Sequence, residues 1–217
     1  MDDEEAYILL LLSDSNLPTG AFVASAGLES YVAHGFFQRI PSTSTGMQSE
    51  VDPSIDFLRN SLATYAHSAL PFVSDTHEIV DAFLALPSDD FSADTSADTL
   101  NHIKALDDLY EAMTLNHVTR RASKSQGVAL LTLYAKGFSK PPHFQVDLST
   151  SSGLQTQRTD RAAKLVEKLK LDVRREKSHG HLPICWAVLT SCLGLSLGAI
   201  RSLLSPVIPI MLSLSFL

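Results

Sequence analysis

The sequence has few cysteines, few charged side chains and a small excess of acid over base. Its two cysteines, Cys185 and Cys192, are too few for a disulfide framework, so we expect a reducing compartment. Charged residues make up 19% of the 217 residues, below the usual ~25%. Seventeen basic and 24 acidic residues give a net charge of −7, which argues against a protein whose main task is to bind nucleic acid.

Sequence motifs of common enzymes are also missing. A phosphate-binding loop ends in Gly-Lys-Ser/Thr, but the small-residue stretch GAFVASAGLES, residues 20–30, has Leu28 and Glu29 at the corresponding positions. No G-x-S-x-G elbow of an α/β-hydrolase occurs. We therefore expect no catalytic residue, no directly bound cofactor and no enzymatic activity. The small residues are expected to let backbones approach closely.

Metal-binding motifs are missing as well. The eight histidines do not complete H-E-x-x-H, and there is no Cys-x-x-Cys. The weak candidates for a metal site are His179 and His181 in SHGHLP, which could act across a symmetric dimer. Solvent-facing histidines are the favoured interpretation, and no metal ligand set is predicted. A metal-dependent hydrolase is thereby disfavoured. The carboxylates of the helix around Asp107 and Glu111 are expected to form a solvated face.

One long apolar run is present, at the C-terminus. Residues 181–200 contain no Asp, Glu, Lys or Arg, and Arg201 alone interrupts the run to Leu217. About 20 apolar residues can span a bilayer, so a tail-anchored membrane adaptor using residues 181–217 is one alternative. A buried core helix is preferred, because glycines, prolines and hydroxyl residues dilute the run. The earlier run at residues 7–12 follows acids rather than the basic segment of a secretory signal.

Periodicity predicts an all-α, single-domain helical bundle. Apolar residues recur at helical spacing, and no strand alternation appears. Helices are predicted over residues 4–12, 21–34, 53–69, 71–86, 99–136 and 160–176. Pro71 is expected to divide two helices, and residues 87–98 to form a polar connection. The arginines Arg120 and Arg121, near Gly127, have two interpretations: a solvated helix crossing, or a surface that meets an acidic partner.

Three segments resemble, in their order and separation, the urease accessory protein F (UreF) family. They are LLSDSNLPTGAFVASAGLESYV at residues 11–32, LDDLYEAMTLNHVTRRASKSQGVALLTLY at 106–134, and GHLPICWAVLTSCLGLSL at 180–197. The residues of these segments are similar to those of the fungal and plant branch of that family. The most specific element is the LP-x-G-x-F…S-x-GLE pattern of residues 17–29. The resemblance covers most of residues 5–197.

The resemblance implies an all-α, often dimeric, non-catalytic accessory protein of the cytoplasm. Such proteins join a D- or H-type accessory protein and a G-type GTPase, and their metallochaperone complex inserts nickel into apo-urease. Nickel and GTP are then handled by the partners, and no nickel ligand is carried over to this chain. The surface that faces the GTPase is expected to include Pro18, Gly20, Phe22, Ser25, Gly27, Glu29, Arg120, Arg121, Gln126 and Gly127.

The end of the chain departs from the family pattern. We expect a UreF-like domain at residues 1–200 and a divergent apolar tail at 201–217. Residues 201–206, RSLLSP, resemble the start of a later family helix, whereas the following VIPIMLSLSFL does not match. Because the family's C-terminal region contributes to docking of the D- or H-type partner, the resemblance implies that this contact is altered here.

Overall fold

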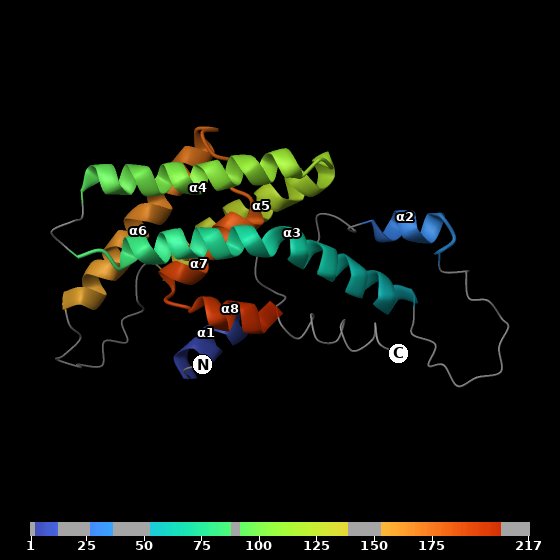
Figure 1. Ribbon diagram of the computed structural model, residues 1–217, viewed down its shortest axis with the longest axis horizontal. Coiled ribbons are helices and arrows are strands. Elements are labelled where there is room, and N and C mark those ends of the chain that lie inside the picture. The colour runs from blue at the N-terminus through green and yellow to red at the C-terminus, as the bar shows by residue number, and fades with distance from the viewer. Residues whose placement is uncertain (1–2, 13–26, 37–52, 88–91, 139–152, 205–217) are drawn as a thin grey trace.

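The computed structural model describes residues 3–12, 27–36, 53–87, 92–138 and 153–204, and these are helical with no strand (Figure 1). The all-α, single-domain bundle is therefore confirmed. The elements are α1 (Asp3–Leu12), α2 (Leu28–Ala33), α3 (Pro53–Leu84), α4 (Ala93–Met113), α5 (His117–Leu133), the π-helical turn η4 (Tyr134–Phe138), α6 (Gly153–Arg174), α7 (Leu182–Cys192) and α8 (Leu197–Leu204).

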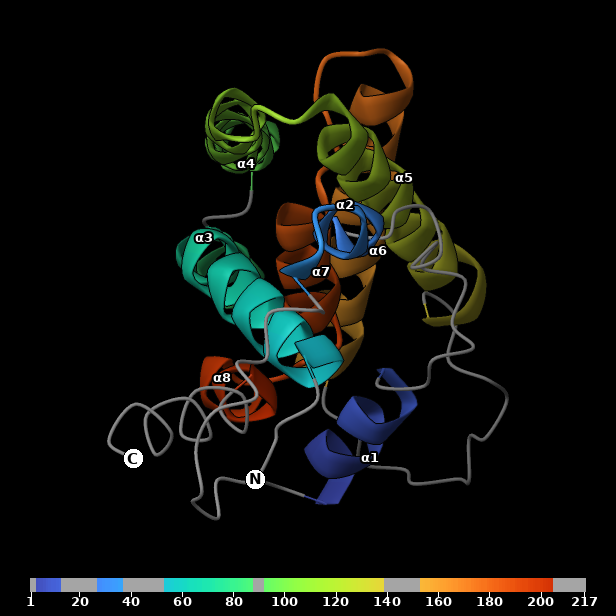
Figure 2. The ribbon, with the colours of Figure 1, turned by 90° about the vertical axis from the view of Figure 1, so that its right-hand side faces the viewer.

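Helix α7 occupies the middle of the bundle, with α3 on one side and α5 on the other (Figure 2). Eight of its eleven residues are buried. A helix that is apolar on all sides is stable only when other helices surround it, and α7 meets that condition. The prediction of a buried core helix in the C-terminal run is confirmed, and Cys185 is a fully buried member of the core.

No helix in the described ranges is long and apolar enough to cross a membrane. The eleven residues of α7 extend about 17 Å, against a hydrocarbon core of about 30 Å. Residues 205–217, which the tail-anchor alternative also requires, lie outside the described residues.

Helix α3 corrects one prediction, because it runs through Pro71 without a break. Proline removes a hydrogen-bond donor and crowds the preceding turn, so it kinks a helix or ends it. Figure 1 shows the two halves of α3 at different slopes. Buried Ala69, Phe72 and Val73 flank the proline on both sides. Packing of these buried residues in the core offsets the cost of the proline, which local sequence reasoning could not weigh.

The predicted helix over residues 99–136 is also wrong, because it is two helices, α4 and α5, followed by η4. Helix α4 begins earlier, at a capping box in which Ser92 Oγ accepts from the Thr95 amide and Thr95 Oγ1 accepts from the Ser92 amide. The expected polar connection over residues 87–98 is correspondingly shorter. Helix α5 begins at Asn116, whose side chain accepts hydrogen bonds from two first-turn amides.

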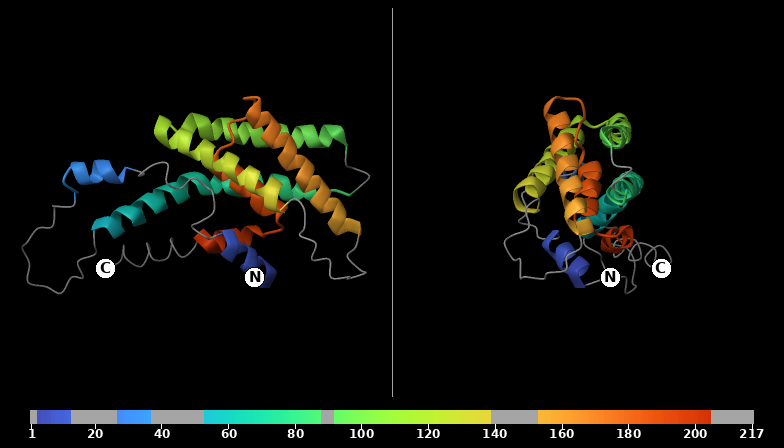
Figure 3. Two further views of the ribbon diagram at one scale, coloured as in Figure 1. Left: turned by 180° about the vertical axis from the view of Figure 1, so that it is seen from behind. Right: turned by 90° about the vertical axis from the view of Figure 1, so that its left-hand side faces the viewer.

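Helices α1, α2 and α8 lie around this bundle. Helix α1 confirms the predicted first helix, and its Glu5 Oε1 accepts a hydrogen bond of 2.8 Å from the Ser196 amide just before α8. Helix α2 contacts α3 through Tyr31 and Phe57, whose ring centroids are 5.0 Å apart. Figures 1 and 3 place α2 beyond the end of the bundle at which α5 begins. Helix α6 confirms the predicted basic helix and begins earlier.

Candidate functional site

The predicted partner-binding residues fall into two groups. Pro18, Gly20, Phe22 and Ser25 lie outside the described residues. Gly27 precedes α2 with φ 94°, a left-handed conformation that glycine adopts readily. Glu29 follows it on the first turn of α2 and is exposed.

The second predicted group lies on α5: Arg120, Arg121, Gln126 and Gly127. Only Arg121 is exposed, whereas Arg120 and Gln126 are half-buried and Gly127 is buried. The group therefore includes one side chain fully available to a partner. Whether any of these residues binds a partner stays a prediction.

Gly127 has a structural role in the contact between α5 and the loop before α7. A Cβ added to Gly127 would lie 2.1 Å from the carbonyl oxygen of Gly180 and 3.0 Å from Cys185 Sγ. A real Cβ does not approach backbone this closely, so only glycine fits here. Gly180 has φ 71°, which glycine again accommodates best. These two glycines bring the loop onto α5.

The same loop is held from the other side by Asp107 of α4. Its fully buried carboxylate accepts four hydrogen bonds, from Ser178 Oγ at 2.6 Å and from the amides of His179, Gly180 and His181 at 2.6, 2.7 and 3.0 Å. Hydrogen bonds to a charged acceptor are the stronger kind. A single side chain thus satisfies three consecutive amides and fixes the path of residues 178–181.

His181 joins α4, α5 and α7 in a chain of hydrogen bonds. Its Nε2 lies 2.7 Å from Glu111 Oε2 and its Nδ1 lies 3.1 Å from Ser123 Oγ. The Leu182 amide donates to the same Ser123 oxygen at 3.0 Å. The neutral tautomer that fits donates from Nε2 to Glu111 and accepts at Nδ1 from the Ser123 hydroxyl.

Burial lowers the pKa of His181 below its ordinary value, although Glu111 and Asp107 act in the opposite direction. The imidazole is therefore neutral at pH 7. Burial alone would raise the pKa of Glu111, but hydrogen bonds from Lys124 and His181 outweigh it and hold that pKa below its ordinary value. Glu111 is accordingly ionised.

Glu111 is also the counter-charge for the cations of α5. Its carboxylate lies 2.9 Å from Lys124 Nζ and 3.4 Å from Arg120 Nη1. Arg120 donates two further hydrogen bonds to the Thr114 carbonyl, where α4 ends. Two of the three cations of α5, Arg120 and Lys124, are therefore ion-paired within the protein, and Arg121 is the third.

The hydrogen-bonded series Glu111–His181–Ser123 has the order of acid, histidine and serine in a catalytic triad. The exposed fractions of Ser123 and His181 are 6% and 0%. The serine oxygen already accepts the Leu182 amide. These groups are engaged in holding the start of α7, and we assign the cluster a structural role.

The candidate metal residues His179 and His181 do lie near each other, with ring centroids 5.9 Å apart. Their nitrogens have other partners: His181 meets Glu111 and Ser123, and His179 Nδ1 lies 3.2 Å from Lys124 Nζ. In the described part of the chain no three His, Cys, Asp or Glu side chains form a group that could hold a metal ion.

Sequence reasoning misjudged two parts of this cluster. It placed Asp107 on a solvated face and favoured exposed histidines, whereas Asp107 and His181 are both fully buried. A signal was present for Asp107, because it stands at helical spacing between Ile103 and Tyr110 on the apolar face of α4. No sequence signal pairs His181 with Ser123 of α5, 58 residues earlier.

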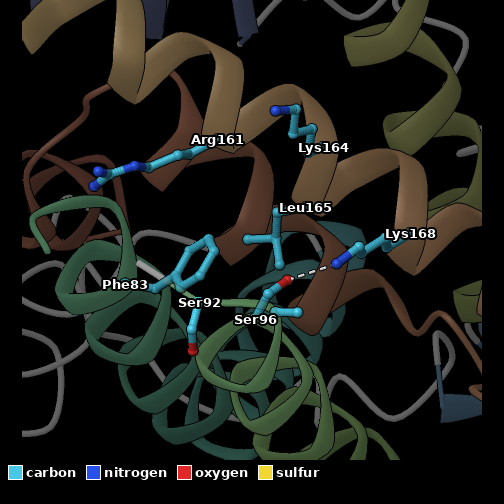
Figure 4. Close-up of a pocket in the computed structure, with 8 residues that line it drawn as sticks. Phe83, Ser92, Ser96, Arg161, Lys164, Leu165 and Lys168 are labelled. Carbon is cyan, nitrogen blue, oxygen red and sulfur yellow. Dashed lines mark hydrogen bonds between the residues drawn. The ribbon is translucent and has the colours of Figure 1, made fainter. Parts of the chain in front are cut away.

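A separate pocket of about 260 Å³ lies between the start of α4 and the middle of α6 (Figure 4). Its lining includes Phe83, Ser96, Arg161, Lys164, Leu165 and Lys168. Lys168 Nζ donates to Ser96 Oγ at 2.9 Å, and Arg161 donates to the Leu86 carbonyl. Two of its three cations therefore already have partners in the protein.

Comparison with known proteins finds relatives of one kind. The family model described as UreF matches residues 52–204. "Urease accessory protein 6" of Cryptococcus neoformans var. grubii is 37% identical over 202 residues, which cover 88% of this chain and 64% of the relative. "Uncharacterized urease accessory protein UreF-like" of Schizosaccharomyces pombe is 27% identical over 193 residues, covering 89% and 63%. The chain thus spans less than two thirds of either relative. No solved structure matches it.

Proposed function

This chain belongs to the UreF family, and we propose that it is a non-catalytic accessory protein of urease maturation. In this proposal it acts in the cytoplasm as a scaffold or checkpoint. It couples GTP hydrolysis by a G-type GTPase to nickel insertion into apo-urease, together with a D- or H-type accessory protein. Nickel and GTP are bound by these partners, and the chain forms a homodimer.

The observation that carries the proposal is an exposed apolar corner where α4 meets α5. The exposed fractions are 52% for Leu109, 57% for Met113, 86% for Leu115 and 46% for Val118. Contiguous exposed apolar side chains are typical of protein–protein contact sites. Arg121 stands one turn beyond Val118, and arginine beside apolar groups is typical of interface centres.

The internal hydrogen bonding of the polar cluster agrees with this role. Glu111, Ser123 and His181 hold the loop and the start of α7, which makes α4 and α5 a rigid support for the corner. A protein that presents a fixed surface needs no reactive group of its own. This is consistent with a scaffold that positions two other proteins.

Complementation tests the proposal. The chain is expressed in a urease-positive strain lacking its own F-type protein, and urease activity is measured with and without added nickel. We expect activity to return. We also expect the G-type and D- or H-type proteins to co-purify with the chain. Absence of both partners from a well-folded preparation would contradict the proposal.

Matched surface variants locate the contact. Arg121→Ala and Leu115→Ser change the corner, whereas Arg175→Ala and Leu10→Ser change the same residue types at exposed positions on other parts of the chain. We expect the first pair to lose the co-purified GTPase and the second pair to retain it. Equal retention by all four variants would exclude this corner as the contact.

A further inference from the structure

Three cations gather where α6 passes η4. Lys170 and Arg174 stand one turn apart on α6, and Lys136 belongs to η4. Among the described residues, no carboxylate forms an ion pair with any of the three. Two cations of α5 differ, because Lys124 and Arg120 form ion pairs with Glu111.

A cavity of about 400 Å³ lies beside these cations, between α6 and η4. This is within the range of about 300–1,000 Å³ that small-molecule sites occupy. Lys170 and Arg174 line it together with Glu167, and apolar residues complete the wall: Tyr134, Ala135, Ala163, Val166 and Leu171. Ala163 and Arg174 are eleven positions apart, so the lining extends about 16 Å along α6.

The electrostatics of the cavity favour an added anion. Burial lowers the pKa of Lys170, and repulsion from Arg174 and Lys136 lowers it further. Like charges held together near a partly desolvated surface raise the free energy of the unliganded protein. Glu167 also lines the cavity but lies beyond salt-bridge distance of these cations. A bound anion would reduce the repulsion and give the cations the ion-pair partner that they lack among the described residues.

We propose that this cavity binds a small phosphate monoester. Its phosphate lies on Lys170 and Arg174, with Lys136 adding to the local positive charge. Arginine presents a planar fork that matches phosphate oxygens, and lysine adds a point charge. A hydroxyl or amino group of the ligand donates to Glu167, one turn earlier on α6. The apolar wall accommodates the carbon skeleton between the two ends.

The pocket of Figure 4 offers a weaker candidate, although it also contains three cations. Lys168 and Arg161 there already donate to Ser96 and to the Leu86 carbonyl. The proposal for the cavity beside η4 is independent of the role in urease maturation, and its test does not use urease.

Titration calorimetry at constant ionic strength tests the site with two probes, inorganic phosphate and phosphoethanolamine. We expect saturable binding at one site per chain, with phosphoethanolamine the tighter ligand. Lys170→Ala and Arg174→Ala should each lower the affinity for both probes by about tenfold, equivalent to ~1.4 kcal/mol of binding free energy. The control Arg175→Ala removes an exposed charge next to Arg174 without changing the cavity lining, and should leave both affinities unchanged.

The Glu167→Gln variant distinguishes the contribution of the amino group to binding from that of the phosphate. It should weaken the binding of phosphoethanolamine and leave the affinity for inorganic phosphate unchanged, because only the amino group of phosphoethanolamine contacts Glu167. Equal affinity of wild-type protein for the two probes would overturn the assignment of Glu167. Circular dichroism of each variant checks that a lost heat signal reflects binding rather than unfolding.

Chemical modification gives a second readout. The lowered pKa of Lys170 leaves more of its amine neutral at pH 8, so an acylating reagent should modify it faster than exposed Lys177. Phosphate should protect Lys170 and leave Lys177 unprotected. A linear, non-saturating heat signal, or an equal loss of affinity in Arg175→Ala, would show unspecific charge attraction and overturn the proposal.

Discussion

A Cβ on Gly127 would lie 2.1 Å from the carbonyl oxygen of Gly180. Two glycines, 53 positions apart in the sequence, therefore let the loop before α7 lie directly on α5. From the opposite side Asp107 accepts the amides of that loop. The start of the central helix is thus held between α4 and α5, next to the corner assigned to partner binding.

Replacing Gly127 by alanine should destabilise the protein by about 2 kcal/mol or more, because the atom opposite the new methyl belongs to the backbone and cannot rotate away. The measurement is the free energy of unfolding in urea. Gly137→Ala is the control, since a Cβ there would meet nothing within 4 Å. A loss at Gly127 no greater than that at Gly137 would contradict the close approach.

Asp107→Asn should cost about 2–3 kcal/mol of stability. The amide NH₂ cannot accept hydrogen bonds, so buried donors among Ser178 and the following amides lose their acceptor. Amide hydrogen exchange at residues 179–181 should accelerate. Asp108→Asn is the matched control, because its side chain is half exposed and its one ion pair among the described residues is with His179. It should change stability by less than about 0.5 kcal/mol.

The stability of the protein should fall as the pH is lowered from about 7 through the histidine range. The folded state lowers the pKa of His181 below the unfolded value of about 6.5. The unfolded chain therefore binds this proton first, and unfolding becomes easier as the pH falls. The effect levels off once the pH is below the folded pKa. Urea unfolding from pH 8 to 5 measures it.

Two variants check the assignment to His181. His181→Gln should reduce the slope of stability against pH, whereas His102→Gln, at an exposed position, should keep it. The wild-type His181 ring proton, followed by NMR, should titrate below the unfolded histidine value. A titration above that value would refute the predicted direction.

The adjacent arginines of α5 should behave differently. Arg120→Ala should cost about 1 kcal/mol, because Arg120 donates twice to the Thr114 carbonyl and pairs with Glu111. Arg121 is exposed, and the described residues provide it with no ion-pair partner. Arg121→Ala should leave thermal stability unchanged while weakening GTPase binding. A lower melting temperature for Arg121→Ala than for Arg120→Ala would contradict the expectation that Arg121 acts only in partner binding.

Local sequence patterns predict most of the helices, but they place a break in α3 that does not exist and miss the break between α4 and α5. The strong local rule for proline predicts a helix break at Pro71, yet α3 is continuous there, with buried Ala69, Phe72 and Val73 packed in the core on either side. The apolar periodicity runs across the division between α4 and α5, although Asn116 is a good N-cap residue. Helix ends depend on capping that is readable locally, whereas helix continuity depends on the core.

The candidate site was only partly foreseen. The sequence predicts close packing or partner contact at Gly127, and the close packing is observed. The polar neighbours of Asp107 and Glu111 predict a solvated face, although the helical spacing of Asp107 with Ile103 and Tyr110 indicates burial. The sequence does not indicate which residues are their hydrogen-bond partners. Their partners lie about 70 residues away, in the loop before α7.

The sequence by itself determined the helical class, the apolar central helix and the family, because these follow from short-range periodicity and from segments matched in order. Only the tertiary structure decided which polar residues are buried. Asp107, Ser123 and His181 meet because three helices converge, and a buried carboxylate or imidazole is stable only where that convergence supplies its hydrogen-bond partners. The same convergence leaves Arg121 and the apolar corner exposed.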